Sequence, residues 1–253
     1  MFRQAIWYGC ILLETLIVFR GARQKLVFKY PIFYGYVLSV VLVELLRFCA
    51  FHWYPTAYAE VYWNSQFLSL LVGCGVVFEV YRVGLRDFPG TARMARNLLF
   101  LVFAMVFAKA IVTSADGTSW WAALTAMKLE RDLRIVQTSA LAVLAVAFLS
   151  YAIPLSRNLK GILLGYGIFL GTSVVQLTVM VRAGEIFRGP WDYLRSIAYF
   201  SVLVIWVRML WSYREAPKPA RAITLDEDYN MLVANTRRRF QKTRLALGKV
   251  VRP

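Results

Sequence analysis

Seven long apolar stretches alternate with short polar segments along this chain. They cover residues 4–20, 31–52, 58–81, 97–115, 133–154, 161–181 and 190–213. A helix of about 20 apolar residues crosses the roughly 30 Å hydrocarbon core of a bilayer, and continuous apolar runs of this length favour helices over barrel strands. The pattern therefore predicts an all-α, polytopic integral membrane protein, with a seven-helix bundle over residues 1–213 and a tail at 214–253.

Composition supports this class. Hydrophobic residues make up 59% of the 253, and mean hydropathy is +0.54, whereas soluble domains are about 45–50% apolar. The net charge of +16 is concentrated in the gaps and the tail. Anionic lipid headgroups are therefore a better match than nucleic acid as the partner of this charge.

Lys and Arg cluster in alternate gaps between the stretches. The gaps after the first, third and fifth stretches, together with the tail, hold 20 of them, whereas the opposite side of the bundle holds 7. Basic loops stay in the cytoplasm, so the pattern predicts an N-terminus outside and a C-terminus inside. In the fourth gap, Lys128–Asp132 and Glu130–Arg134 have i,i+4 spacing, which predicts a helix that extends the fifth span outward.

The tail carries the signals of one cytoplasmic helix at about 225–247. Thr224 and Glu227 form a capping box, and basic residues lie near the other helix end, where the helix dipole favours them. This helix either lies on the inner leaflet as an amphipathic helix or is a solvated basic helix; nucleic-acid binding is disfavoured, because no aromatic residues interleave with the charges. The predicted headgroup-binding residues are Arg237, Arg238, Arg239, Lys242 and Arg244.

Glycines four residues apart occur twice in the sixth stretch, at Gly161 and Gly165 and at Gly167 and Gly171. Such spacing lets another helix backbone approach closely. We expect these glycines to pack helices within the bundle; an interface with a second copy of the chain is the alternative.

Ionisable and amide side chains inside the stretches are the main functional candidates, because each costs free energy in hydrocarbon. At about 1.5 Å of rise per residue, many of them share one layer in the outer half. Three interpretations stay open: a structural network in which, for example, Glu44 and Arg47 neutralise each other, an outward-facing cavity for a small polar or anionic ligand, or an ion path. Glu79, near a span end, is expected to contact water. The candidate ligand-binding residues are Glu44, Arg47, Asn64, Gln66, Lys109, Arg134, Gln137 and Gln176.

The residue types argue against catalysis and against a cofactor or metal. His52 is the only histidine, which excludes paired-histidine haem ligation and histidine-cluster metal sites. Because His52 lies at a span end, we also expect no Ser-His-Asp triad. The cysteines, Cys10, Cys49 and Cys74, lie in apolar stretches without CxxC spacing and are interpreted as small buried hydrophobes. A carboxylate-based lipid enzyme stays open, without a second motif to support it.

Four segments carry a resemblance to a group of seven-helix bacterial inner-membrane proteins. They are the aromatic run 58–63, the end of the third span at 78–82, the start of the fifth at 129–137, and 211–213. The chain resembles this group over about residues 5–215, without the basic tail. The resemblance implies a seven-helix bundle and no particular activity, and it directs attention to Glu130, Arg131, Arg134 and Gln137.

These features predict a non-enzymatic binding protein of a bacterial inner membrane, either receptor-like or an accessory subunit of a membrane complex. The expected partners are the bilayer, anionic headgroups at the tail, and another membrane protein or a second copy of the chain. A small-solute or ion transporter is the alternative. Transporters often contain broken helices or internal repeats, and the sequence shows neither.

Overall fold

The protein is all-helical in the computed structural model, which describes residues 2–114, 119–150, 153, 155–183, 188–214, 230–236 and 238. Within these ranges, side chains are described from residue 6 onward, except at 110–111, 113–128 and 180–192. The 3-10 helices η1 (Leu26–Phe28) and η2 (Pro55–Ala57) lie in two connections. The long helices of the described residues are α1 (Phe2–Arg23), α2 (Pro31–Trp53), α3 (Tyr58–Gly84), α4 (Pro89–Ser114), α5 (Ser119–Ser150), α6 (Arg157–Ala183) and α7 (Arg188–Met209).

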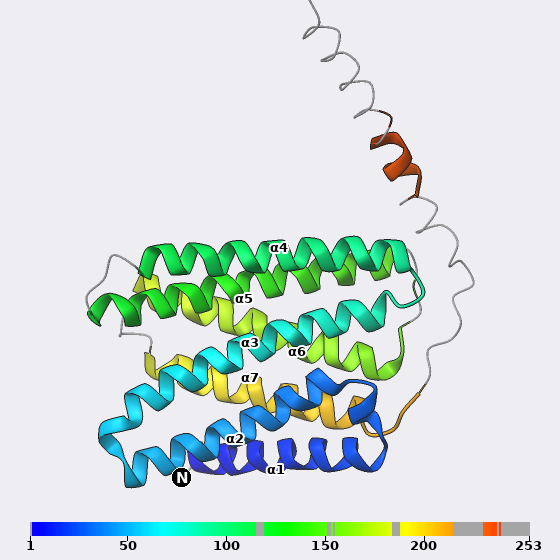
Figure 1. Ribbon diagram of the computed structural model, residues 1–253. Helices are drawn as coiled ribbons and strands as arrows, with labels where there is room; N and C mark the ends of the chain where they lie inside the picture. Colours follow the sequence, from blue (N-terminus) through cyan, green and yellow to red (C-terminus); the bar gives the residue numbers. More distant parts are fainter. Residues whose placement is uncertain are drawn as a thin grey trace, which may run out of the picture.

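The helices pack as a ring. Each packs against its neighbours in sequence, and α1 packs against α7 to close the ring. α3 is the most central, because it contacts α2, α4, α5 and α6 (Figure 1). This arrangement places one face of α1, α2, α3, α5, α6 and α7 toward a shared interior.

Consecutive helices run antiparallel, so the connections alternate between two ends of the bundle. The α1–α2 and α3–α4 connections lie at the end where α7 finishes, whereas the N-terminus and the α2–α3 connection lie at the opposite end (Figure 1). The largest differences from the predicted boundaries are at two helix starts: α4 starts at Pro89 rather than 97, and α5 starts at Ser119 rather than 133. The helical extension predicted before residue 133 is therefore present.

Among the described residues, five helices are long and apolar enough to cross a membrane: α2, α3 with η2, α4, α5 and α6. Their outer faces expose large apolar side chains, such as Leu42, Phe67, Phe100, Val146 and Leu164. Contiguous apolar surface of this kind is rare on proteins surrounded by water, which indicates a membrane-embedded protein. α1 and α7 are not among the five, so the seven predicted crossings and their orientation stay predictions.

Only one of the two glycine pairs on α6 lies at a helix contact in the described structure. A Cβ added at Gly161 or at Gly165 would collide with side chains of α7, the second with the fully buried Trp206. A Cβ at Gly167 or Gly171 would have nothing within 4 Å. Gly167 and Gly171 therefore do not pack helices of the described bundle, and the alternative of an interface with a second copy stays a prediction for this pair. An α-helix turns by about 100° per residue, so Gly167 points away from the face that Gly165 shares with α7.

Glu79 ties α3 to the start of α2. Its side chain is buried, and its two oxygens accept hydrogen bonds from the backbone N–H groups of Ile32 at 3.0 Å and Phe33 at 2.7 Å. The first N–H groups of a helix lack partners within the helix, and a negative charge is favourable there. The expectation that Glu79 contacts water was wrong, because a neighbouring helix start supplies its partners.

The segment at the end of α7 is held by side chains from the start of α6 and the end of α1. Asn158 at the start of α6 is fully buried and donates its amide hydrogens to the carbonyls of Met209 at 3.3 Å and Ser212 at 3.1 Å. From α1, the guanidinium carbon of Arg20 lies 3.6 Å from the centroid of the Trp211 ring. Arginine on an indole face is favourable, so these contacts close the ring at its basic end.

The predicted tail helix is described only in part. Residues 230–236 and 238 are helical, and Arg238 is exposed. The other predicted headgroup-binding residues, Arg237, Arg239, Lys242 and Arg244, lie outside the described residues.

Candidate functional site

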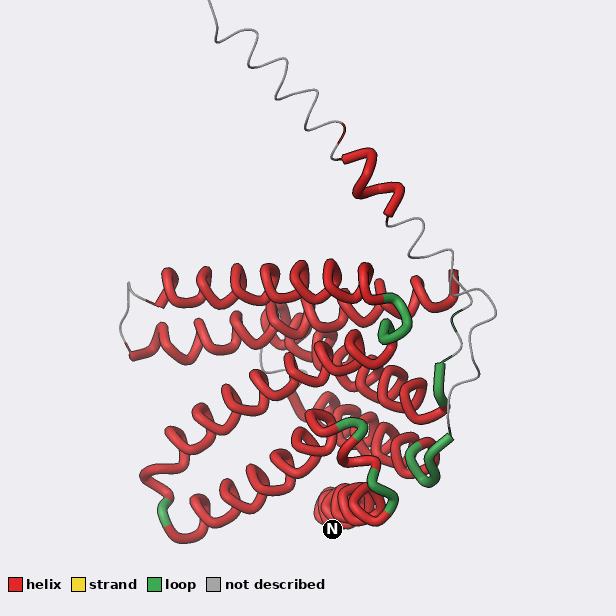
Figure 2. The backbone as a smooth tube through the Cα atoms, turned by 45° about the vertical axis from the view of Figure 1, so that its right-hand side comes forward, coloured by secondary structure: helices red, strands yellow, loops and turns green. Residues whose placement is uncertain are grey.

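A cavity of ≈1120 Å³ lies inside the ring, with lining residues from α1, α2, α3, α5, α6 and α7. No described residue of α4 lines it. Phe51, His52 and Tyr58, which flank the α2–α3 connection, belong to its wall. Toward that end the α2–α3 hairpin diverges from the α4–α5 hairpin (Figure 2). The cavity therefore lies toward the end of the bundle that carries the N-terminus.

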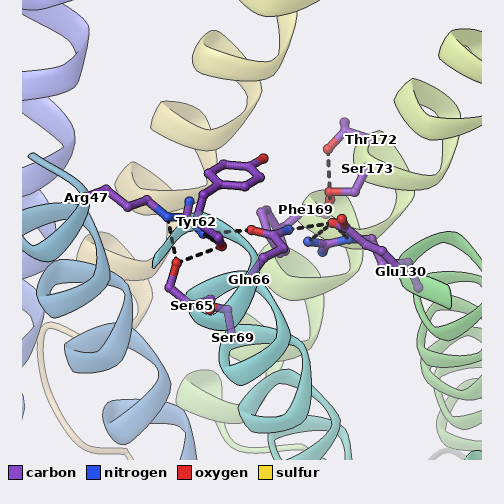
Figure 3. Close-up of polar contacts among 10 residues, drawn as sticks. Arg47, Tyr62, Ser65, Gln66, Ser69, Glu130, Phe169, Thr172 and Ser173 are labelled. Carbon is purple, nitrogen blue, oxygen red and sulfur yellow. Dashed lines mark hydrogen bonds and ion pairs between the residues drawn. The ribbon is translucent and has the colours of Figure 1, made fainter. Parts of the chain in front are cut away.

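Arg47 on α2 is held in the cavity wall by neutral acceptors of α3. Its Nε donates to Ser65 Oγ at 2.9 Å, and its Nη2 donates to Gln66 Oε1 at 3.0 Å and to the Tyr62 carbonyl at 3.3 Å. The guanidinium carbon lies 4.5 Å from the centroid of the Tyr62 ring. Figure 3 shows Arg47 reaching across to this helix. The guanidinium is therefore fixed in orientation.

Gln66 extends this network to α5. Its Nε2 donates to Glu130 Oε1 at 2.8 Å, and the same oxygen binds Nη2 of Arg134 at 2.8 Å (Figure 3). The side chains of Arg134 and Glu130 are 11% and 13% exposed. The guanidinium carbon of Arg134 lies 5.1 Å from the centroid of the Phe169 ring on α6. One chain of contacts thus joins α2, α3, α5 and α6.

The lining carries an excess of positive charge. Arg134 is neutralised by Glu130, but within the described part of the chain no carboxylate lies within ion-pair distance of Arg47 or Arg195, which both line the cavity. Glu44 is the one acidic residue of the lining, and its Oε2 is buried without a hydrogen-bond partner. Glu44 and Arg47 form no direct ion pair, because Arg47 turns toward α3. With Glu44 counted as fully negative, the described lining residues together with Glu130 still carry a net positive charge.

A carboxyl group on α1 adjoins the interior of the cavity. Glu14 is 0% exposed, and Tyr199 of α7, a lining residue, donates its hydroxyl hydrogen to Glu14 Oε1 at 2.5 Å. Glu14 Oε2 is buried without a partner. Cys10, one turn away on α1, also lines the cavity. The Glu14–Tyr199 hydrogen bond therefore joins the first and last helices where the ring closes.

Aromatic side chains of α1 and α2 form another part of the wall. Trp7 and Phe48 both line the cavity, and their rings stack with centroids 6.0 Å apart. Tyr8 and Phe51 line it too and are mostly exposed. The cavity thus has a cationic and polar wall and an aromatic wall.

Half of the predicted binding residues lie together at this cavity. Glu44, Arg47, Gln66 and Arg134 line it, and they come from three helices. Arg134 and its partner Glu130 were also singled out by the resemblance. The predicted outer polar layer therefore corresponds in part to one site.

The other predicted binding residues lie outside the lining. Gln137 is buried and donates to Cys74 Sγ at 3.1 Å, Gln176 is buried on α6, and Asn64 is exposed.

Lys109 is the main correction to the predicted site. Its Nζ forms an ion pair with Asp132 at 3.0 Å, and its side chain is 68% exposed. The structure does not bring Lys109 to Glu44, because α4 packs on α3 and α5 without facing the cavity. Depth along a helix could be read from the sequence, but the direction in which α4 faces could not.

Arg195 and Tyr199 of α7 are site residues that the sequence analysis did not select. In the sequence analysis, Arg195 contributes only to the total of 7 Lys and Arg residues on the side of the bundle opposite the basic gaps. The two residues are four apart, so they share one helix face. Two polar residues on one face of the otherwise apolar seventh stretch could have identified them from the sequence.

No group of three or more His, Cys, Asp and Glu side chains that could hold a metal ion occurs among the described residues. No protein family matches the chain, and comparison with curated proteins and with solved structures found no significant similarity. The candidate site therefore rests on its geometry and charge.

Proposed function

We propose that α1 and α7 cross the membrane with the five other helices, in a bacterial inner membrane, with the N-terminus outside. Each has 22 residues, about 33 Å at 1.5 Å per residue, which matches the hydrocarbon core. Both pack along helices of span-like composition. The buried Glu14 of α1 has a partner on α7, which lowers the cost of a carboxyl group at that depth. The orientation is supported by the bias of Lys and Arg toward one set of gaps.

Within this topology, the protein is a non-enzymatic membrane binding protein, receptor-like or an accessory subunit of a membrane complex, whose cavity in the outer half binds a small anionic ligand. One observation carries the proposal: Arg47 and Arg195 line one cavity without a carboxylate partner among the described residues. Unpaired charge in a low-dielectric interior is costly, and this cost falls on the half-buried Arg47, whereas Arg195 is exposed at the wall. An anion between these two arginines would reduce that cost.

The arrangement of the cavity favours ligand binding over transport. Neutral acceptors fix Arg47 before any ligand arrives, and a guanidinium held in one orientation loses little conformational entropy when it binds an anion. The alternative, a small-solute or ion transporter, has less support, because the long helices are unbroken in the described residues, whereas transporters commonly bind at broken helices.

The basic tail is proposed to bind anionic headgroups at the inner leaflet. The support is the helical stretch 230–236, where Met231 and Leu232 are exposed, together with the basic residues that follow it in the sequence. Loss of liposome binding by a tail peptide when phosphatidylglycerol is replaced by phosphatidylcholine would support this role. Equal binding to both would contradict it.

The cavity proposal is tested by thermal unfolding of the purified protein with glycerol 3-phosphate, and with glycerol as the neutral control. A ligand at 100 times its Kd stabilises the folded state by about 2.7 kcal/mol, a rise of roughly 5–10 °C in melting temperature for a protein of this size. Glycerol 3-phosphate is expected to produce this rise in the unmodified protein and in Arg96→Gln, which removes an exposed charge on α4. Arg195→Gln should abolish it. An equal rise in both variants would refute an anion site between Arg47 and Arg195.

A further inference from the structure

The dimensions of the cavity exceed what a small anion needs. Its volume of ≈1120 Å³ lies above the roughly 300–1,000 Å³ typical of pockets for drug-sized ligands. Its lining on α2 runs from Tyr36 to His52, about 24 Å of helix at 1.5 Å per residue. This length is a large part of a bilayer core.

The lining of α2 follows one face of the helix. Its apolar and aromatic members are Tyr36, Val40, Val43, Phe48 and Phe51, with spacings of three to five residues that keep them on one side. Glu44 and Arg47 interrupt this row. A ligand that follows the face therefore meets both apolar surface and charge.

The cationic part of the wall is confined to one region. Arg47 and Gln66 are joined by a hydrogen bond of 3.0 Å, and Gln66 is joined through Glu130 to Arg134. Arg195 lies near the start of α7, at the same end of the bundle as the end of α2. The site thus offers one place for an anionic group and a longer apolar wall, which includes Trp7 and Phe48, for the remainder of a ligand.

We propose that the cavity binds an anionic amphiphile, with a phosphate or carboxylate head at Arg47 and Arg195 and an apolar chain along the aromatic wall of α1 and α2. This rests on the proposed function and names its ligand class. Both parts of the ligand gain from the site: the head from charge-assisted hydrogen bonds, and the chain from burial against aromatic rings. Such a ligand can reach a bundle within the bilayer from the membrane itself.

The test compares three probes on the purified protein in one detergent: dioctanoyl phosphatidic acid, dioctanoyl phosphatidylcholine and glycerol 3-phosphate. The first carries head and chains, the second the same chains under a zwitterionic head, and the third the head alone. We expect phosphatidic acid to bind at least a hundredfold more tightly than glycerol 3-phosphate and at least tenfold more tightly than phosphatidylcholine. If phosphatidylcholine binds as tightly as phosphatidic acid, the proposal is refuted, because the protein then binds lipid chains without recognising the head, as annular lipid does.

Two variants separate head from chain recognition. Arg195→Gln should weaken both glycerol 3-phosphate and phosphatidic acid. The double variant Phe48→Ala, Phe51→Ala should weaken phosphatidic acid by about tenfold and leave glycerol 3-phosphate unchanged. The controls are Arg96→Gln and Phe100→Ala, exposed residues on α4, which has no described residue in the cavity; neither should change binding.

Failure of this inference is distinguishable from failure of the proposed function. If glycerol 3-phosphate binds through Arg195 as tightly as phosphatidic acid does, the ligand is a small anion; the amphiphile is refuted and the anion site stands. If neither phosphate binds in an Arg195-dependent way, both proposals are refuted.

Discussion

Tyr199 on α7 donates its hydroxyl hydrogen to Glu14 on α1, with 2.5 Å between the two oxygens, inside a bundle where Glu14 has no exposed surface. The two residues are 185 positions apart in sequence. Their hydrogen bond lies where the first and last helices close the ring, beside the cavity that Tyr199 lines.

We predict that Tyr199→Phe lowers the free energy of unfolding by about 1–2 kcal/mol, because hydrogen bonds between membrane helices contribute about that much and the variant leaves Glu14 without a donor. Ser201→Ala, on the exposed side of α7, is the control and should be near neutral. In a double-mutant cycle with Glu14→Leu, which removes the acceptor, a coupling energy of zero would show that the bond contributes nothing.

The two glycine pairs of α6 should differ in how much a large side chain at each position destabilises the protein. Gly165→Leu should destabilise the protein by more than about 3 kcal/mol, because its side chain would push Trp206 and α7 away. Gly171→Leu should lie within about 0.5 kcal/mol of the unmodified protein, because its Cβ position faces open space. Melting in detergent measures both. Similar losses for the two would mean that the second pair also faces a packed surface, such as another copy of the chain.

The two ion pairs of α5 should also differ. Glu130→Gln leaves the mostly buried Arg134 without its carboxylate, and loss of one partner of a buried pair costs about 3 kcal/mol or more. Asp132→Asn breaks the more exposed pair with Lys109, and exposed pairs contribute at most about 1 kcal/mol. Chemical unfolding of both variants tests this. Equal losses would contradict the distinction between the inner and outer pairs.

Lys109 and Glu44 should behave independently. In a double-mutant cycle with Lys109→Gln and Glu44→Gln, the two effects on stability should add within about 0.5 kcal/mol, as expected for residues without contact or shared partners. The matched cycle of Lys109→Gln with Asp132→Asn should show a small favourable coupling, because these two side chains form an ion pair. Coupling in the first cycle alone would indicate that Lys109 interacts with Glu44 in the cavity.

The proposed orientation is tested by cysteine labelling in intact cells. Thr56→Cys and Asp87→Cys introduce thiols at exposed positions at opposite ends of the bundle, with Cys49 replaced by serine, since Cys10 and Cys74 are buried. An impermeant maleimide should label Thr56→Cys in intact cells and label Asp87→Cys only after permeabilisation. The reverse pattern would mean that the N-terminus is inside.

The sequence alone determined the helices of this protein and the depth of its polar residues. Long apolar runs set off by short polar gaps can satisfy their backbone only as helices in a bilayer, so each predicted stretch corresponds to one of α1 to α7, although α4 and α5 start earlier than predicted. Rise per residue is constant in a helix, which is why Glu44, Arg47 and Gln66 could be assigned to one layer before their contacts were known.

Only the tertiary structure decided which side of each helix faces the interior. Apolar residues suit both lipid and protein neighbours, so the apolar pattern of a membrane helix says little about its rotation. Lys109 was predicted as the central cation and Arg195 was not, yet α4 turns Lys109 toward Asp132 and α7 turns Arg195 toward the cavity. In the same way, Gly165 and Gly171 look alike in sequence, and the rotation of α6 places only Gly165 against α7.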